Sequence, residues 1–167
     1  MTVIPDARWG NPEGLLAKVG TAFASTKVGS RTIRSLMPLD RRVLIRTGGR
    51  KTLLGPMGLP TMVLETIGRK SGQPRLSPLL FARDGDSVIV AGSNFGQEHH
   101  PAWTGNLIAQ PAATVVAGGR RIAVSASLLE GDERDRAYHA MIGMNPVYAE
   151  YRKRTDRPIR VFRLTPQ

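Results

Sequence analysis

Three cations close to one short turn are the feature of this sequence that best suits chemistry. Arg69, Lys70 and Arg75 surround a segment with two glycines and a proline, and the hydroxyls of Ser71 and Ser77 lie beside them. Cations this close repel one another unless water or an anion lies among them. Arginine binds phosphate through two parallel hydrogen bonds, and lysine acts as a point charge. The turn therefore predicts a phosphate site; the alternative is a solvated basic turn with no partner.

A second group of polar and aromatic residues lies where strands and turns are expected to end. With the basic turn they could line one pocket, and they are Ser77, Ser93, Asn94, Trp103, Asn106, Tyr148 and Tyr151. The sequence has no local signature of a catalytic triad, and its three histidines lack the spacing of metal ligands. A cofactor that carries the difficult chemistry needs mainly position and electrostatics from the protein. We therefore expect a cofactor pocket and no metal site.

The chain carries a large and uneven positive charge. Lysine and arginine total 24 and aspartate and glutamate 13, so the formal net charge is +11. Residues 1–75 hold 13 basic and 4 acidic side chains (+9), and residues 76–167 hold 11 and 9 (+2). The first half suits an anionic partner: a phosphate-bearing cofactor, an acidic membrane surface or nucleic acid. Only 5% of the residues are aromatic, which argues against a stacking surface, so no nucleic acid is expected.

Length and composition predict a single domain. A chain of 167 residues can bury a sizeable core, and the absence of cysteine excludes disulfides and thiolate metal sites. No apolar run approaches the length of a membrane span, and the N-terminus lacks the pattern of a signal peptide. We therefore expect a cytoplasmic protein.

Residues 1–60 predict a basic, amphipathic helical arm and a loop. Asn11, Pro12 and Glu13 form a helix start. Apolar residues follow at helical spacing: Leu15, Leu16, Val19 and Phe23. A second segment, 31–46, is interrupted by Pro38, which favours two short helices. Such an arm can lie on an anionic membrane as a peripheral contact; the simpler interpretation is an ordinary helix that covers one end of the core.

Residues 61–167 predict a small antiparallel barrel. Apolar runs separated by turn residues give six strands, at 62–67, 75–83, 87–91, 112–117, 120–129 and 159–164. Helical spacing follows at 101–110, 132–141 and 147–154, with a break at Asn145 and Pro146. The pattern is that of an α+β fold in which helices flank the barrel.

These motifs, in this order, resemble the signature of the deazaflavin-dependent nitroreductases and oxidoreductases of actinobacteria. The resemblance covers roughly residues 60–165. It rests on Thr66-x-Gly68-Arg69-Lys70-Ser71-Gly72-x-Pro74-Arg75-x-x-Pro78-Leu79, Asp84-Gly85, Ala91-Gly92-Ser93, Pro101-x-Trp103-x-x-Asn106-Leu107, Pro111 and Pro146-x-Tyr148-x-x-Tyr151. It implies a six-stranded antiparallel split β-barrel, related to that of flavin mononucleotide-binding oxidases, which uses coenzyme F420.

The resemblance also implies roles for single residues. The phosphate and acidic tail of F420 would be held by Arg69, Lys70, Ser71 and Arg75. The deazaflavin ring would be lined by Leu76, Ser77, Pro78, Leu79, Leu80, Ala91, Gly92, Ser93 and Asn94, and on another side by Ala102, Trp103 and Asn106. Tyr148 would lie beside the ring and the substrate, and Tyr151 at the pocket mouth. The expected catalytic residues are Tyr148, Ser93 and Tyr151.

Two positions depart from the pattern of that family. Asn94 and Phe95 replace what is often lysine and glycine, which would weaken or move part of the anion site. Asn145 stands where the nitroimidazole-activating member has a third tyrosine, which puts reduction of nitroimidazoles in doubt.

The activity implied by the resemblance is hydride transfer from reduced F420 to an electron-poor small molecule: a quinone, an enone or lactone, or a nitroaromatic. Two alternatives stay open. One is a related split-barrel reductase that binds flavin mononucleotide, and the other is a non-catalytic barrel that carries lipid or fatty acid. Flavin absorbance or co-purified lipid would distinguish them.

Overall fold

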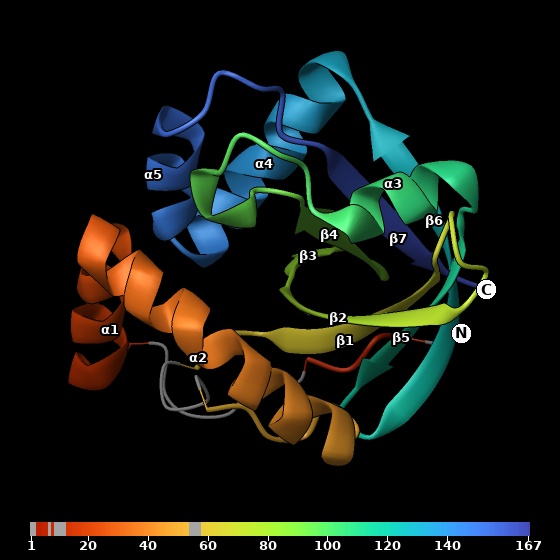
Figure 1. Ribbon diagram of the computed structural model, residues 1–167, viewed down its shortest axis with the longest axis horizontal. Helices are drawn as coiled ribbons and strands as arrows, with labels where there is room; N and C mark the ends of the chain where they lie inside the picture. Colours follow the sequence, from red (N-terminus) through yellow and green to blue (C-terminus); the bar gives the residue numbers. More distant parts are fainter. Residues whose placement is uncertain (1–2, 7, 9–12, 54–57) are drawn as a thin grey trace.

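The computed structural model describes residues 3–6, 8, 13–53 and 58–167 (Figure 1). Within these residues one antiparallel sheet carries seven strands in the order β2-β1-β5-β6-β7-β4-β3. The strands are β1 (Thr61–Ile67), β2 (Pro74–Leu80), β3 (Ala82–Asp84), β4 (Ser87–Ala91), β5 (Ala112–Ala117), β6 (Arg120–Leu129) and β7 (Val161–Pro166). The α+β class is confirmed.

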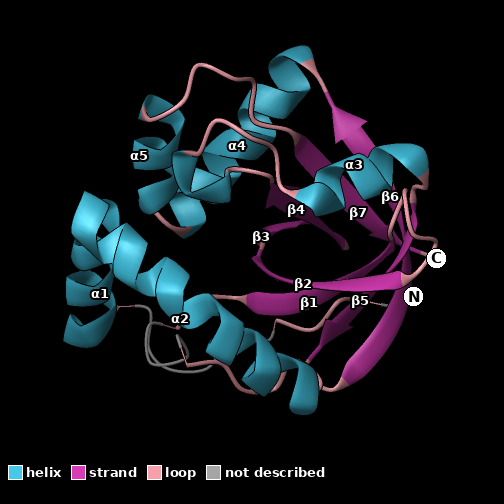
Figure 2. Ribbon diagram, viewed as in Figure 1, coloured by secondary structure: helices cyan, strands magenta, loops and turns pink. Residues whose placement is uncertain are grey.

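The run expected as one strand at 75–83 forms two strands, so the prediction of six strands is wrong. β2 ends at Leu80 and β3 begins at Ala82, and between them the side chain of Phe81 enters the core with 1% of its surface exposed. β2 pairs with β1 and β3 with β4, at opposite edges of the sheet. Because a single residue joins the two edges, the sheet must curl until they meet, which gives the half-barrel seen in Figure 2.

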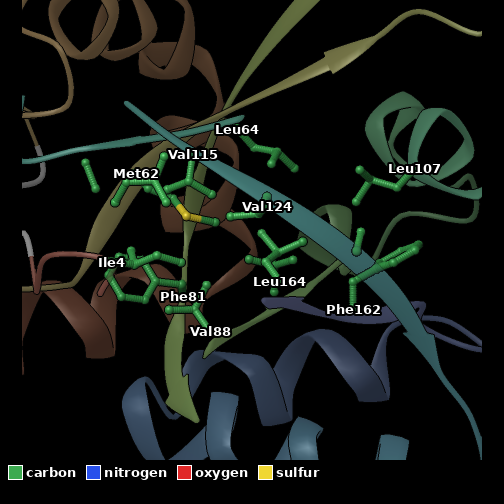
Figure 3. Packing of buried hydrophobic residues seen from close by; sticks show 14 of the residues in the cluster. Ile4, Met62, Leu64, Phe81, Val88, Leu107, Val115, Val124, Phe162 and Leu164 are labelled. Atoms are coloured by element: carbon green, nitrogen blue, oxygen red, sulfur yellow. The ribbon is translucent and has the colours of Figure 1, made fainter. Parts of the chain in front are cut away.

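The inside of the curl holds the main hydrophobic core. Figure 3 shows side chains from β1, β4, β5, β6 and β7 pointing toward one another, with Leu107 reaching in from a helix. Ile4 is also fully buried there. β1 is buried on both faces: Met62 and Leu64 face inward, and Val63 packs outward in a separate cluster with Leu44. A helix must therefore cover the outer face of β1.

That helix is α2 (Lys27–Arg46), which runs without a break through Pro38. The expectation of two short helices is wrong. Proline inside a helix costs roughly 3 kcal/mol because it removes a hydrogen bond and crowds the preceding turn. Here the ring of Pro38 is exposed, while Leu44 is buried against β1 and Ile33 is half-buried. Tertiary packing along that face offsets the cost.

The helix before it, α1 (Leu15–Ser25), meets α2 at a tight corner (Figure 1). Thr26 caps α2 by accepting a hydrogen bond from the backbone N–H of Gly29 at 2.9 Å. A Cβ at Gly29 would overlap the carbonyl of Phe23, so only glycine fits this position. The expected helix start at Asn11 and Pro12 lies outside the described residues. The described helix begins at Leu15.

Three more helices and one 3₁₀ turn complete the described chain: η1 (Asn94–Gly96), α3 (Ala102–Ala109), α4 (Gly131–Met144) and α5 (Val147–Lys153). They agree with the helices expected at 101–110, 132–141 and 147–154, including the break at Asn145 and Pro146. β7 begins two residues later than the strand expected at 159–164. In the described part of the chain, no helix combines the length and the apolar character that crossing a membrane requires.

Candidate functional site

A cavity of about 220 Å³ lies between the β2 side of the half-barrel and the helices α2 and α5. Its floor is formed by β2 and one end of β1, and its walls by the end of β4, η1, the start of α3 and α5. α1 and α2 form the remaining side. Most of the residues expected to form the site line this cavity, and these are Ser77, Pro78, Leu79, Leu80, Ala91, Ser93, Asn94, Trp103, Tyr148 and Tyr151. Their roles stay predictions.

The floor strand has a free backbone edge. The N–H of Gly68 donates to the Gln73 carbonyl at 2.9 Å, and the N–H of Phe81 donates to the Pro60 carbonyl at 3.3 Å. The register between β1 and β2 is unbroken. In β2, the backbone N–H and C=O groups of odd-numbered residues therefore point toward β1, and those of even-numbered residues point away from it. Pro78 tolerates an outward position because it has no N–H. The N–H groups of Leu76 and Leu80 point outward, and each can donate a hydrogen bond to a ring carbonyl of a planar ligand.

The basic turn lies beyond the cavity at the far end of β2. Arg69, Lys70, Ser71 and Arg75 are exposed, and none of them lines the cavity. Arg75 is two residues from Ser77, a distance of about 7 Å along a strand. Among the described residues, no carboxylate forms an ion pair with these cations. Floor and turn together fit a ligand with a flat ring at one end and an anionic tail at the other.

Asn106 has a different position from the one expected. Its buried side chain accepts a hydrogen bond from the backbone N–H of Arg69 at 3.1 Å and donates to the Thr66 hydroxyl at 3.0 Å. It therefore joins α3 to the basic turn and does not line the cavity. A Cβ at Gly105 would overlap the Arg69 guanidinium, so that side chain lies directly against α3. α3 is a platform for the turn.

Two tyrosines of α5 form one wall. The rings of Tyr148 and Tyr151 meet edge to face with centroids 5.7 Å apart. The hydroxyl of Tyr138 in α4 donates a hydrogen bond to the backbone carbonyl of Tyr148 at 2.7 Å. Burial raises the pKa of Tyr148 well above its ordinary value. Burial also raises the pKa of Tyr151, opposed by the nearby Arg154 and by a hydrogen bond with Ser30. Both phenols therefore keep their protons at neutral pH.

The loop that carries Ser93 is held by an arginine that the sequence analysis did not identify. Arg157 donates to the carbonyls of Gly92 at 3.1 Å, Ser93 at 2.8 Å and Gln97 at 2.7 Å. Its Nη1 also donates to Nδ1 of His100 at 3.0 Å, so His100 must be neutral there. No local motif marks Arg157, because its partners lie about sixty residues earlier in the chain.

The departures from the family pattern also have a structural context. Asn94 and Phe95 have φ values of 48° and 58°, a left-handed conformation in which glycine is the usual residue. The Phe95 ring packs on Tyr151 with centroids 5.6 Å apart. Asn145 accepts a hydrogen bond from the N–H of Val147 at 3.1 Å, at the start of α5, and also lines the cavity.

The N-terminal arm forms one side of the cavity, and the sequence analysis did not name its lining residues. Ala24, Ile33, Met37, Asp40 and Leu44 line it. Four of the five follow the spacing i, i+4, i+7 and i+11 on α2, which is one face of a helix. That spacing was present in the sequence, but the expected break at Pro38 concealed it.

Comparisons with known proteins identify the family. The model of the F420H(2)-dependent quinone reductase family matches residues 41–166. The F420H(2)-dependent quinone reductase of Mycobacterium tuberculosis is 34% identical over 133 residues, which is 78% of this chain and 89% of the relative.

Two solved structures are also similar. The F420-H2 dependent reductase FDR-A is 34% identical with a TM-score of 0.58, over 63% of this chain and 93% of that one. A structure described as a domain-swapped dimer is 30% identical with a TM-score of 0.59, over 81% of this chain and 98% of that one.

These matches confirm the expected oxidoreductase class and the cofactor, coenzyme F420, and favour them over a flavin mononucleotide reductase or a lipid carrier. The family and the Mycobacterium tuberculosis relative are named for quinone reduction, and these names give no support to nitroaromatics. The chain belongs to the F420H(2)-dependent quinone reductase family.

Proposed function

We propose that this protein reduces a quinone with hydride from reduced F420, and that both bind in the cavity between β2, α2 and α5. The observation that carries the proposal is the continuity of the floor: the edge strand β2 leads from an apolar cavity to three exposed cations at the turn, none of which forms an ion pair with a carboxylate of the described residues. F420 has the matching form, a flat deazaflavin with a phosphate and an acidic tail. When bound, it supplies the hydride.

We assign the holding of the cofactor to two groups of residues. The exposed turn would bind the phosphate and acidic tail through Arg69, Lys70, Ser71 and Arg75. The ring would lie on β2, between Leu76 and Leu80, with Ala91, Gly92, Ser93 and Asn94 along the loop side and Ala102 and Trp103 at the start of α3. Asn106 would act through the position of Arg69. The flat floor and the tyrosine wall would hold ring and acceptor in contact, which converts a bimolecular step into an effectively unimolecular one.

Tyr148, Ser93 and Tyr151 would act on the acceptor. Quinone oxygens gain negative charge as hydride arrives, and a fixed hydrogen-bond donor stabilises that charge. The raised pKa of Tyr148 suits this role, because a phenol that stays protonated can donate at every pH used in an assay. Ser93 is a second donor at the other side of the cavity, and Tyr151 closes the cavity beside the arm.

We further propose that the protein is cytoplasmic and makes a peripheral contact with an anionic membrane through α1 and α2. The apolar face of α1 is exposed: Leu15 by 78%, Val19 by 59% and Phe23 by 45%. Residues 15–46 carry seven basic side chains and one acidic one, the buried Asp40. Exposed apolar residues among cations are typical of helices that lie in a membrane interface.

The cofactor assignment is tested by fluorescence titration of the purified protein with oxidised F420, run beside flavin mononucleotide. We expect binding of F420, weakened about tenfold or more in Arg69→Ala and in Lys70→Ala, since a charge-assisted phosphate contact is worth about 1.5–3 kcal/mol. Arg120→Ala, an exposed cation at the turn between β5 and β6, is the matched control and should leave the affinity unchanged. Absence of F420 binding, or preference for the flavin, would reject the assignment.

A further inference from the structure

One face of α2 lines the cavity. Leu44, Asp40, Met37 and Ile33 lie on it, and from Leu44 to Ile33 the helix advances about 16 Å. The face is not equally buried along its length. Leu44 and Asp40 are 1% and 3% exposed, whereas Met37 and Ile33 are only partly buried. The helix thus packs on the sheet at its C-terminal end and lines open space nearer its N-terminal end.

The open space lies opposite the tyrosine wall. Ile33 and Leu80 pack against the same hydrophobic cluster, which contains Tyr148 and Tyr151 of α5. A ring that rests on β2 would have the floor on one face. The remaining space, between that ring and α2, is where an acceptor would lie, with Met37 and Ile33 facing it and Tyr148 at its side.

The position of α2 is fixed at both ends. At the C-terminal end, Asp40 accepts hydrogen bonds from the Thr52 hydroxyl at 2.7 Å and from the N–H of Leu53 at 2.5 Å. At the other end, Arg154 of the α5 terminus donates to the Ser30 hydroxyl at 2.8 Å and to the Ser25 carbonyl at 2.6 Å. These contacts fix the backbone of α2, so the space beside it is set by the side chains that the helix turns toward the cavity.

This wall largely precedes the part of the chain that matches the family. The match begins at residue 41, whereas Ala24, Ile33, Met37 and Asp40 come before it. The family model therefore includes β2 and α5 but not most of the residues of this wall.

We infer that Met37 and Ile33 determine which quinones the enzyme accepts, by setting the free height between α2 and the cofactor ring. The inference rests on the proposed function. Their side chains touch the acceptor and leave cofactor binding alone, since the residues proposed for the tail and ring lie on β2 and beyond it. Met37 can adapt to more than one guest because its unbranched side chain has three rotatable bonds.

The test compares Met37→Trp and Met37→Ala with Leu36→Trp and Leu36→Ala. Leu36 is the next residue on the same helix, but it lies outside the cavity and is 48% exposed, so it controls for helix stability and surface effects. Three quantities are measured for each variant: the F420 dissociation constant, kcat/KM for a small benzoquinone, and kcat/KM for a bulky naphthoquinone.

Filling the space in Met37→Trp should lower kcat/KM for the naphthoquinone about tenfold more than for the benzoquinone, because one misfitting group in an apolar pocket changes discrimination by 10- to 200-fold. Met37→Ala and Ile33→Ala enlarge the space, so they should bring kcat/KM for the naphthoquinone closer to kcat/KM for the benzoquinone. The F420 dissociation constant should stay within about twofold throughout, and both Leu36 variants should behave as wild type. The inference would be overturned if the ratio of the two kcat/KM values stayed at the wild-type value in Met37→Trp, Met37→Ala and Ile33→Ala.

Quinone binding without cofactor gives an independent readout. Quinones quench tryptophan fluorescence, and Trp103 lines the cavity, so quinone affinity can be measured in a Trp9→Phe background. If wild-type protein fails to turn over any quinone, the proposed function fails. The quenching titration then still decides the inference, since Met37→Trp must weaken naphthoquinone binding selectively and unchanged affinity contradicts it.

Discussion

Tyr148 combines burial, a raised pKa and a place on the cavity wall. Removing its hydroxyl in Tyr148→Phe keeps the ring that packs on Tyr138 and Tyr151 but removes the proton donor. We expect kcat for quinone reduction to fall by about 100-fold, in the range of a lost oxyanion donor, with the F420 dissociation constant unchanged. Steady-state kinetics and the thermal unfolding midpoint check this. Unchanged kcat would leave Tyr148 with a packing role only.

The residues of the site could be predicted from the sequence only where chemistry is local. The cations of the basic turn lie within seven residues of one another, and the tyrosines of α5 within one helical turn, so both groups could be proposed from the sequence, and their roles stay predictions. Arg157 was missed, because its bonds to Gly92 and Ser93 form only when distant segments meet. For Asn106 the motif names the residue but not the direction of its amide, which in the structure accepts a hydrogen bond from the backbone N–H of Arg69.

At the scale of an element, the loop 92–100 depends on an arginine and a histidine. Arg157 can only donate, so its bond to Nδ1 of His100 requires a neutral imidazole. Accordingly, burial and the charges of Arg160 and Arg157 lower the pKa of His100 from 6.5. The unfolded chain therefore takes up the proton first, and the stabilisation is complete above about pH 6.5 and lost as pH falls below it.

The measurement is the thermal unfolding midpoint between about pH 7 and about pH 5. In His100→Gln the amide oxygen can still accept from Arg157 but does not titrate. The midpoint of this variant should fall less than that of wild type as the pH drops. His139→Gln, at an exposed histidine of α4, is the matched control and should follow wild type. Equal pH dependence of all three proteins would show that His100 does not couple loop stability to pH.

Two elements were misread because local signals compete with packing. Proline at position 38 is a strong helix breaker by propensity, yet burial along one face of α2 outweighs it. The run 75–83 is extended throughout, and nothing local separates Leu80 from Ala82. The division at Phe81 follows from pairing with distant strands, since β2 pairs with β1 and β3 with β4. Apolar runs in the sequence predict where strands lie, but they do not predict which strands pair with each other.

The positive charge of the whole molecule is concentrated in the first half of the chain, and the second half is nearly neutral. The charge of +9 in residues 1–75 includes the turn proposed for the cofactor tail and the helices α1 and α2. A single sign of charge therefore serves two anionic partners, and both would weaken with salt. The two partners differ in how much they depend on apolar residues. Cofactor affinity would not depend on α1. Membrane affinity would combine about 1 kcal/mol per basic residue near the surface with the burial of apolar side chains of α1.

Val19→Ser combined with Phe23→Ser removes apolar side chains from the exposed face of α1 and keeps every charge. Wild type should sediment with vesicles that contain anionic phosphatidylglycerol and stay in solution with neutral phosphatidylcholine. The double variant should bind anionic vesicles at least about tenfold more weakly, because burying an exposed Val or Phe is worth about 1.5–3 kcal/mol.

Leu128→Ser, at an exposed position of β6, is the matched control and should bind as wild type does. The F420 dissociation constant should be the same in all three proteins, which separates the membrane surface from the cofactor site. Wild type that ignores anionic vesicles would reject the membrane contact, and α1 would then serve only to hold α2 and Ala24 at the cavity. If Leu128→Ser lost as much vesicle binding as the double variant, the effect would come from exposed apolar surface in general and not from α1.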